Sequence, residues 1–167
     1  LTSAFWALEG AAVIWVGIRQ SRLIPRLFGA LLQILAGLLY LEESWRGVWD
    51  LPILNSHFLG ATLIAFAGLF TAFYQDRYRE KIHRLERWLP PLFFAWGVAW
   101  WLGGLMQEIE QFVRHPNQWA WLLCALAATA GLAQYLKGRL GWDRLRLIAL
   151  GLLPLLVVAA LLQGFDQ

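Results

Sequence analysis

Long runs of apolar residues alternate with short polar segments along this chain. Each run, with its flanking residues, is long enough to cross a bilayer as an α-helix. The runs cover residues 1–18, 27–41, 58–73, 92–105, 119–136 and 147–162. This pattern predicts an all-α fold, a polytopic transmembrane bundle with six membrane-spanning helices that occupies residues 1–167 as one domain.

The basic residues are distributed unevenly among the gaps between these runs. Twelve of the 14 Lys and Arg residues lie in the first, third and fifth gaps, whereas the second and fourth gaps hold only Arg46 and Arg114. Basic loops stay on the cytoplasmic side of a membrane. The distribution therefore predicts that both termini face outward, on the outer side of the membrane.

The composition supports a lipid environment and excludes several other classes of protein. A mean hydropathy of +0.53 and 59% hydrophobic residues are too high for a soluble domain of this size. The basic pI does not indicate nucleic acid, because the cations lie in short loops where they meet anionic lipid headgroups. The single Cys124 excludes an internal disulfide, and we expect it to be a small packing residue. Since no Met precedes the first apolar run, we expect the chain to be an excerpt of a larger polytopic protein.

The longest inner connection, residues 75–89, predicts a basic amphipathic helix. Its apolar residues fall at helical spacing, and cations occupy the other faces. Such a helix would extend the third run or lie on the inner leaflet. The cations that we expect to contact the lipid of the inner leaflet are Arg77, Lys81, Arg84 and Arg87.

Acidic and aromatic residues mark the two gaps that we expect on the outer side. Two tryptophans four residues apart would share one helical face, either as interfacial anchors or as a stacking platform for a sugar or lipid headgroup. The fourth gap predicts a solvated acidic loop, with a weak cation site as the alternative. We expect neither a metal site nor a cofactor. The candidates for binding at the outer face are Glu42, Glu43, Trp45, Trp49, Glu108 and Glu110.

Glu9 is the main intramembrane candidate. It lies ten residues, or about 15 Å of helix, from Arg19, which places it near the middle of a roughly 30 Å hydrocarbon core. A carboxylate there is costly and points to a function with a definite partner. Gln33 lies at a similar depth on the second run, so we predict a hydrogen bond between Glu9 and Gln33. Glu9 could be a neutral packing residue, couple to an ion or proton, or form a polar wall for an amphiphile.

The segment Phe5-Trp-Ala-Leu-Glu-Gly-Ala-Ala-Val-Ile-Trp-Val-Gly-Ile-Arg19 resembles a recurring stretch, W-A-L-E-G-A-A … W-x-G-x-R, of the bacterial predicted membrane proteins grouped as domain-of-unknown-function family 2339. Residues 31–37, 55–61 and 95–104 resemble the helices that follow it, so the resemblance covers about the first 110 residues. It implies a large, many-helix protein of the bacterial cytoplasmic membrane. The family offers no assigned catalytic residues, so the resemblance supports Glu9 as a site without giving it a role.

The function that we expect is that of a cell-envelope membrane protein that binds or moves an amphiphile, such as a lipid or a lipid-linked sugar. This function needs a cavity that reaches Glu9. The alternatives are a structural or assembly subunit, which would expose rows of small residues such as Ala120, Cys124 and Ala128 to a protein partner or a second copy, and a membrane-embedded transferase. No phosphate loop, HExxH or GxSxG motif supports catalysis.

Overall fold

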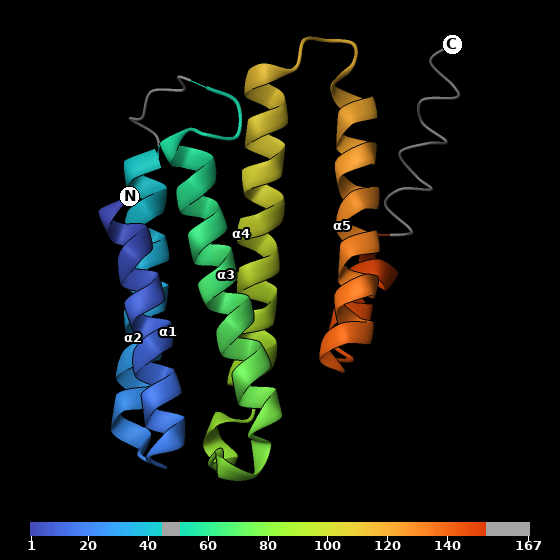
Figure 1. Ribbon diagram of the computed structural model, residues 1–167. Helices are drawn as coiled ribbons and strands as arrows, with labels where there is room; N and C mark the ends of the chain where they lie inside the picture. The colour runs from blue at the N-terminus through green and yellow to red at the C-terminus, as the bar shows by residue number, and fades with distance from the viewer. Residues whose placement is uncertain (45–50, 153–167) are drawn as a thin grey trace. The chain divides into compact units, whose positions relative to one another are not determined.

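The computed structural model describes residues 1–44 and 51–152, which form helices and no strands. The all-α class is therefore confirmed for these residues. Two short 3₁₀ turns, η1 (Arg79–Lys81) and η2 (Arg84–Glu86), connect the third helix to the fourth, and residues 145–152 are helical as well. The α-helices, shown in Figure 1, are α1 (Thr2–Arg19), α2 (Leu23–Ser44), α3 (Ser56–Arg77), α4 (Leu89–Phe112) and α5 (Gln118–Leu140).

Four of these helices are long and apolar enough to cross a membrane. They comprise residues 23–42 of α2 and the whole of α3, α4 and α5. The helix α1 does not belong to this set, and most of the sixth apolar run lies outside the described residues. The prediction of a membrane bundle is thus confirmed in its coarser form, while six spans and outward termini stay predictions.

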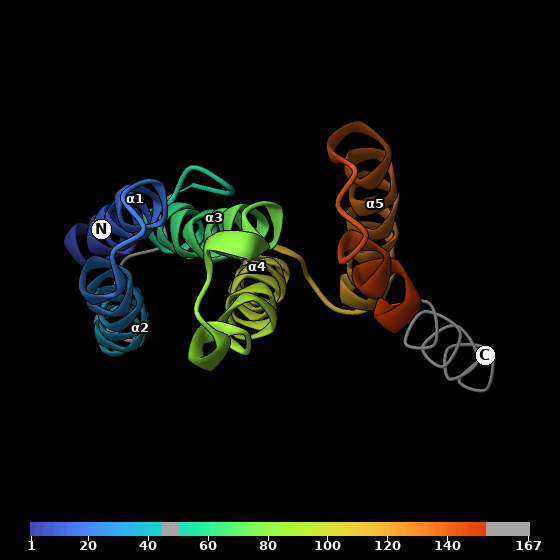
Figure 2. The ribbon, with the colours of Figure 1, turned by 90° about the horizontal axis from the view of Figure 1, so that it is seen from below.

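The contacts divide the chain into two compact units, Leu1–Gly104 and Leu105–Gln167. In the first unit α3 lies between α1 and α4, and α2 packs beside α1 (Figure 2). Small residues of α1 and α2 form the centre of its core together with Tyr40 and Ile64. In the second unit the residues that the structure buries are Glu108, Thr129, Ala133, Trp142, Leu145, Ile148 and Leu152.

Glycines allow neighbouring helix backbones of the first unit to touch. A Cβ atom on Gly10 would lie 2.7 Å from the carbonyl oxygen of Gly29, so α1 and α2 meet backbone to backbone. A Cβ atom on Gly97 would lie 2.8 Å from the carbonyl oxygen of Ala65, which brings α3 and α4 equally close. Close packing of this kind is what associates helices where water exclusion cannot.

The face of α4 that packs is not the one that the spacing of its smallest residues favours. Ala95, Ala99 and Gly103, a row at four-residue spacing, are exposed, whereas Phe93 and Gly97 are buried. The contact with α3 is made on the face that carries Gly97, whose Cβ position lies within 3 Å of atoms of Ala65 and Leu69. A row of small residues therefore did not identify the contact face.

The prediction of a basic amphipathic helix over residues 75–89 is wrong. The helix α3 continues to Arg77, and then η1 and η2 turn the chain, with Ile82 extended between them, before α4 begins at Leu89. Ile82 and Leu89 are buried. The apolar side chains of this connection thus pack on the end of the bundle, which a straight surface helix would not allow.

We expect Gly97→Ala to destabilise the first unit by about 1–3 kcal/mol, because its Cβ atom would collide with backbone atoms of α3 that cannot move aside. The measurement is the unfolding transition of the purified protein in mild detergent. Gly103→Ala is the matched control in the same helix, since no heavy atom of the described structure lies within 4 Å of that Cβ position. Equal stability of the two variants would contradict backbone contact at Gly97.

Candidate functional site

Three buried polar side chains lie along one face of α2. Arg26, Gln33 and Tyr40 are seven residues apart, so they share a face and are separated by about 10 Å per step. Their exposed fractions are 4%, 1% and 4%. We call these three residues the polar column. Each of them binds a different segment of the chain.

Arg26 binds the connection between α3 and α4. Its Nη1 atom donates to the carbonyl oxygen of Lys81 at 3.0 Å, and its Nε atom donates to that of Arg22 at 2.9 Å. The same Nη1 atom lies 3.0 Å from Glu86 Oε2. Since Nη1 is directed at Lys81 and neither carboxylate oxygen of Glu86 has an aligned donor among the described residues, the contact with Glu86 is ionic rather than a well-formed hydrogen bond.

Glu86 is a buried carboxylate with an incomplete set of partners. Burial raises the pKa of the Glu86 carboxyl above its ordinary value, and the charges of Arg26 and His83 offset this rise only in part. The side chain is 2% exposed. A buried carboxylate without full hydrogen bonding is costly, so the pair serves to position the connection more than to stabilise the fold.

Gln33 binds α3 and not Glu9. Its Nε2 atom donates to Thr71 Oγ1 at 2.7 Å, and both side chains are 1% exposed. The predicted hydrogen bond between Glu9 and Gln33 is therefore wrong. The α1 residue that meets Gln33 is Gly10, whose Cβ would lie 2.8 Å from Gln33 Cγ. Glu9 is exposed because the buried residues of α1 recur every three or four positions and leave it on the opposite side.

Tyr40 binds the start of α3. Its hydroxyl lies 2.9 Å from the carbonyl oxygens of both Ser56 and His57, and its ring packs against Gly60, where a side chain would collide with it. Asn55 caps the same helix start, because its Oδ1 atom accepts from the backbone N–H of Phe58 at 2.8 Å.

The acidic outer-face candidates divide between the two units, with Glu42 and Glu43 in the first and Glu108 and Glu110 in the second. Glu42 is exposed and Glu43 lies in the last turn of α2, while Trp45 and Trp49 lie outside the described residues. The acidic loop predicted at residues 107–118 is helical as far as Phe112. Glu108 is buried and Glu110 is exposed, because two positions along a helix point to different sides.

The four cations that we expected at the inner leaflet, Arg77, Lys81, Arg84 and Arg87, are all exposed. In the first unit they lie at the end of the bundle where α1 also turns into α2 (Figure 1). We call this end, which carries Arg19, Arg22 and residues 77–87, the basic end. On the second unit, Ala120, Cys124 and Ala128 are exposed on α5, so Cys124 is not the packing residue that we expected.

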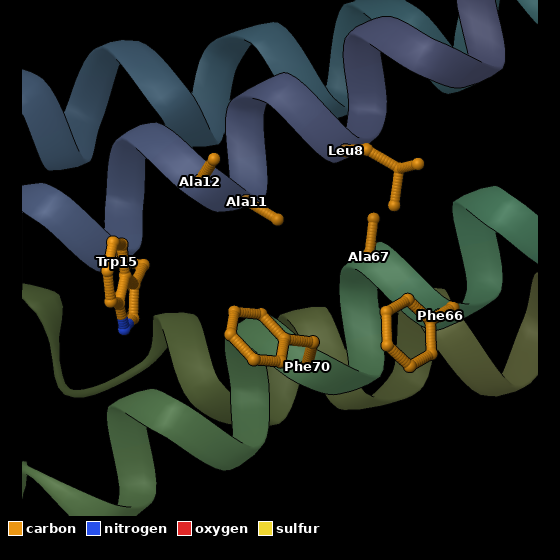
Figure 3. A pocket seen from close by; sticks show the side chains of 7 residues that line it. All are labelled: Leu8, Ala11, Ala12, Trp15, Phe66, Ala67 and Phe70. Atoms are coloured by element: carbon orange, nitrogen blue, oxygen red, sulfur yellow. The ribbon is translucent and has the colours of Figure 1, made fainter.

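An apolar groove of about 210 Å³ lies between α1 and α3, where Figure 3 shows side chains of α1 such as Leu8 and Ala11 facing those of α3. Trp15 closes one end, and Phe66 and Phe70 form the wall on α3. Glu9 does not line this groove. The lining residues are Leu8, Ala11, Ala12, Trp15, Phe66, Ala67 and Phe70.

Sequence reasoning missed both the polar column and the groove, although a signal for each is present. Polar residues at seven-residue spacing in an otherwise apolar helix mark the column. Aromatic residues at four-residue spacing, Phe66, Phe70, Tyr74 and Tyr78, mark the wall of the groove and its continuation. Glu86 carried no signal, since it lies among many charged residues.

Comparison with protein families finds one model, described as predicted membrane protein (DUF2339), that matches residues 1–167. The match extends over the whole chain and therefore beyond the first 110 residues that carry the resemblance in the sequence. Comparison with curated proteins and with solved structures finds no match.

We expect Arg26→Gln to destabilise the protein by about 3–5 kcal/mol at neutral pH, because it leaves the Glu86 carboxylate buried without a cation. Since Arg26 lowers the pKa of Glu86, its removal raises that pKa further. The native state then holds the Glu86 proton more tightly than the unfolded chain does. The deficit in stability should therefore shrink as the pH falls through this raised pKa toward the ordinary value of 4.5.

The measurement is denaturant unfolding in detergent at several pH values between 5 and 8. The double variant Arg26→Gln/Glu86→Gln is the control, because it has no carboxylate at this position to titrate. A deficit that is independent of pH in the single variant, or that grows as the pH falls, would contradict the assignment.

Proposed function

We propose that this chain, which belongs to the predicted membrane protein family DUF2339, binds the hydrocarbon part of a membrane amphiphile in the groove between α1 and α3. We also propose that it is a multi-pass protein of the cytoplasmic membrane of a bacterial cell envelope, because its basic residues lie in alternate gaps, as the positive-inside rule requires of such a protein. The observation that carries the proposal is the groove, an open apolar trough with aromatic walls between helices of a membrane protein.

Shape supports this proposal more than hydrophobicity does. Inside a bilayer an acyl chain gains nothing from leaving water, so selective binding must come from close contact with the protein. Flat rings of Trp15, Phe66 and Phe70 offer such contact, and the small Ala12 leaves room for the chain. An amphiphile that occupies the groove would be held in a definite place while the surrounding lipid exchanges.

The proposed binding site does not include Glu9, because Glu9 does not line the groove. The sequence had favoured a cavity reaching Glu9 from the outer side, but the groove is lined by the neighbouring face of α1. A polar wall formed by Glu9 therefore has no support. The amphiphile hypothesis now depends on the α1–α3 interface alone.

The exposure of Glu9 favours a second candidate, the assembly of this unit with another helix. Glu9 has no hydrogen-bond or ionic partner among the described residues, and a carboxylate near the middle of a membrane requires one. A helix that carries a donor, from a partner or from a second copy, would supply it. For this candidate, Glu9→Leu should leave the stability of the isolated protein unchanged and abolish its association in detergent, measured by mass photometry.

We expect Ala12→Phe to fill the groove and to reduce occupancy by an acyl chain about tenfold, the equivalent of about 1.4 kcal/mol of lost contact. The measurement uses a lipid with a photoactivatable acyl chain, followed by mapping of the labelled peptides of α1 and α3. Val16→Phe is the matched control, since Val16 is exposed on the same helix and does not line the groove.

Labelling that spreads evenly over all apolar helices, or that is equal in the two variants, would contradict the proposal. Unfolding transitions of both variants show whether the bundle is intact. Because Ala12 is exposed, we expect neither substitution to disturb the core.

A further inference from the structure

A row of stacked rings leads from the groove to the basic end. Phe66 and Phe70 lie 6.2 Å apart and nearly parallel, and Phe70 stacks on Tyr74 at 5.9 Å. Tyr74 then contacts Tyr78, with ring centroids 4.6 Å apart. From α1, Trp15 meets Tyr74 edge to face at 6.5 Å. We call Phe66, Phe70, Tyr74 and Tyr78 the aromatic row. It changes from hydrocarbon rings in the groove to hydroxylated rings at the basic end.

Two cations lie over aromatic rings at the basic end. The guanidinium of Arg19 lies 5.0 Å from the centre of the Trp15 ring, and the ammonium of Lys81 lies 5.4 Å from that of Tyr78. Cations in such positions are attracted to the ring face and keep donors free on their outer side. Both side chains are exposed, and neither forms a salt bridge with a carboxylate among the described residues.

The polar column fixes the position of Lys81. Arg26 donates to the backbone carbonyl of Lys81, and its ionic contact with Glu86 binds the next turn of the same connection. Ile82, the neighbour of Lys81, is buried. The backbone at Lys81 is therefore fixed by the hydrogen bond from Arg26 and by the burial of Ile82. This restricts the positions that the Lys81 ammonium can reach.

From this arrangement we infer that the amphiphile of the groove is an anionic phospholipid whose headgroup phosphate is bound by Arg19 and Lys81. This inference rests on the proposed function, because the groove must first accept an acyl chain. The inference rests on charge complementarity. The aromatic row ends at Arg19 and Lys81, two cations without salt bridges among the described residues, and phosphate oxygens accept hydrogen bonds from both a guanidinium and an ammonium. A zwitterionic headgroup would place its own ammonium near these cations and would bind less tightly.

The test uses two photoactivatable lipids with identical acyl chains, phosphatidylglycerol and phosphatidylcholine, in mixed nanodiscs that contain the purified full chain. The readout is the ratio of the two lipids crosslinked to peptides of α1 and α3. We expect the wild-type protein to prefer the anionic lipid by about 25-fold at low ionic strength, since each of the two cations near a membrane surface contributes about fivefold. Arg19→Gln/Lys81→Gln should abolish this preference and leave phosphatidylcholine labelling unchanged.

The matched control is Arg84→Gln/Arg87→Gln, which removes the same charge from the same end of the bundle, at exposed residues outside the aromatic row. A loss of preference that is equal in the two double variants would show a diffuse surface potential and would overturn the inference. Equal labelling by both lipids in the wild type would also overturn it while leaving the proposed function intact. Absence of labelling in α1 and α3 by either lipid would instead refute the proposed function.

Discussion

A polar side chain inside an apolar bundle must find its partner within the protein, and this constraint shapes the first unit. Each residue of the polar column donates to a segment that is distant in the sequence: the connection after α3, the last third of α3 and its first turn. Gln33 meets the constraint only through its Nε2 atom, since its Oε1 atom has no hydrogen-bond partner among the described residues. An unmet polar group in hydrocarbon costs several kcal/mol. The polar column therefore restricts the position of α3 against α2 more strongly than apolar contacts would. A hydrogen bond requires a defined distance and direction, whereas apolar side chains can pack in several registers.

Glycine contacts and the polar column support each other. The column residue Gln33 reaches Thr71 only because Gly10 lets α1 lie directly on α2 without pushing it aside. At the basic end, a Cβ on Gly17 would lie 2.7 Å from Arg26 Cγ, so this glycine makes room for the side chain that holds the α3–α4 connection. Gly10 and Gly17 on α1 thus leave the space that the long side chains of Gln33 and Arg26 on α2 occupy.

The same arrangement produces the candidate site as a consequence of packing. The small residues of α1 pack against α2 and α3. The groove lies where alanines of α1 face the large rings of Phe66 and Phe70 on α3. The connection that Arg26 holds brings Lys81 to the end of this groove. Groove, aromatic row and cations therefore form one continuous surface built from three segments of the chain.

The sequence by itself determined the class of the protein, its helical content and its family. Four helices are long and apolar enough to cross a membrane, a property of length and composition that needs no tertiary information. The cap that Asn55 provides at the start of α3 likewise depends on local chemistry alone. The sequence also placed the basic residues of the first and third gaps at one end of the bundle, where the structure has them.

Only the tertiary structure decided which faces of the helices meet. Gln33 was expected to bind Glu9 because their depths agree, yet depth does not fix rotation about a helix axis, and Gly10 faces Gln33 instead. The connection after α3 has the spacing of an amphipathic helix, but a buried ion pair and two buried apolar residues bend it into turns. The expectation that Cys124 packs inside the protein was wrong for the same reason. In a chain where nearly every helix is apolar on all sides, hydrophobic periodicity no longer tells the buried face from the exposed one, so close packing and the pairing of polar groups make that choice.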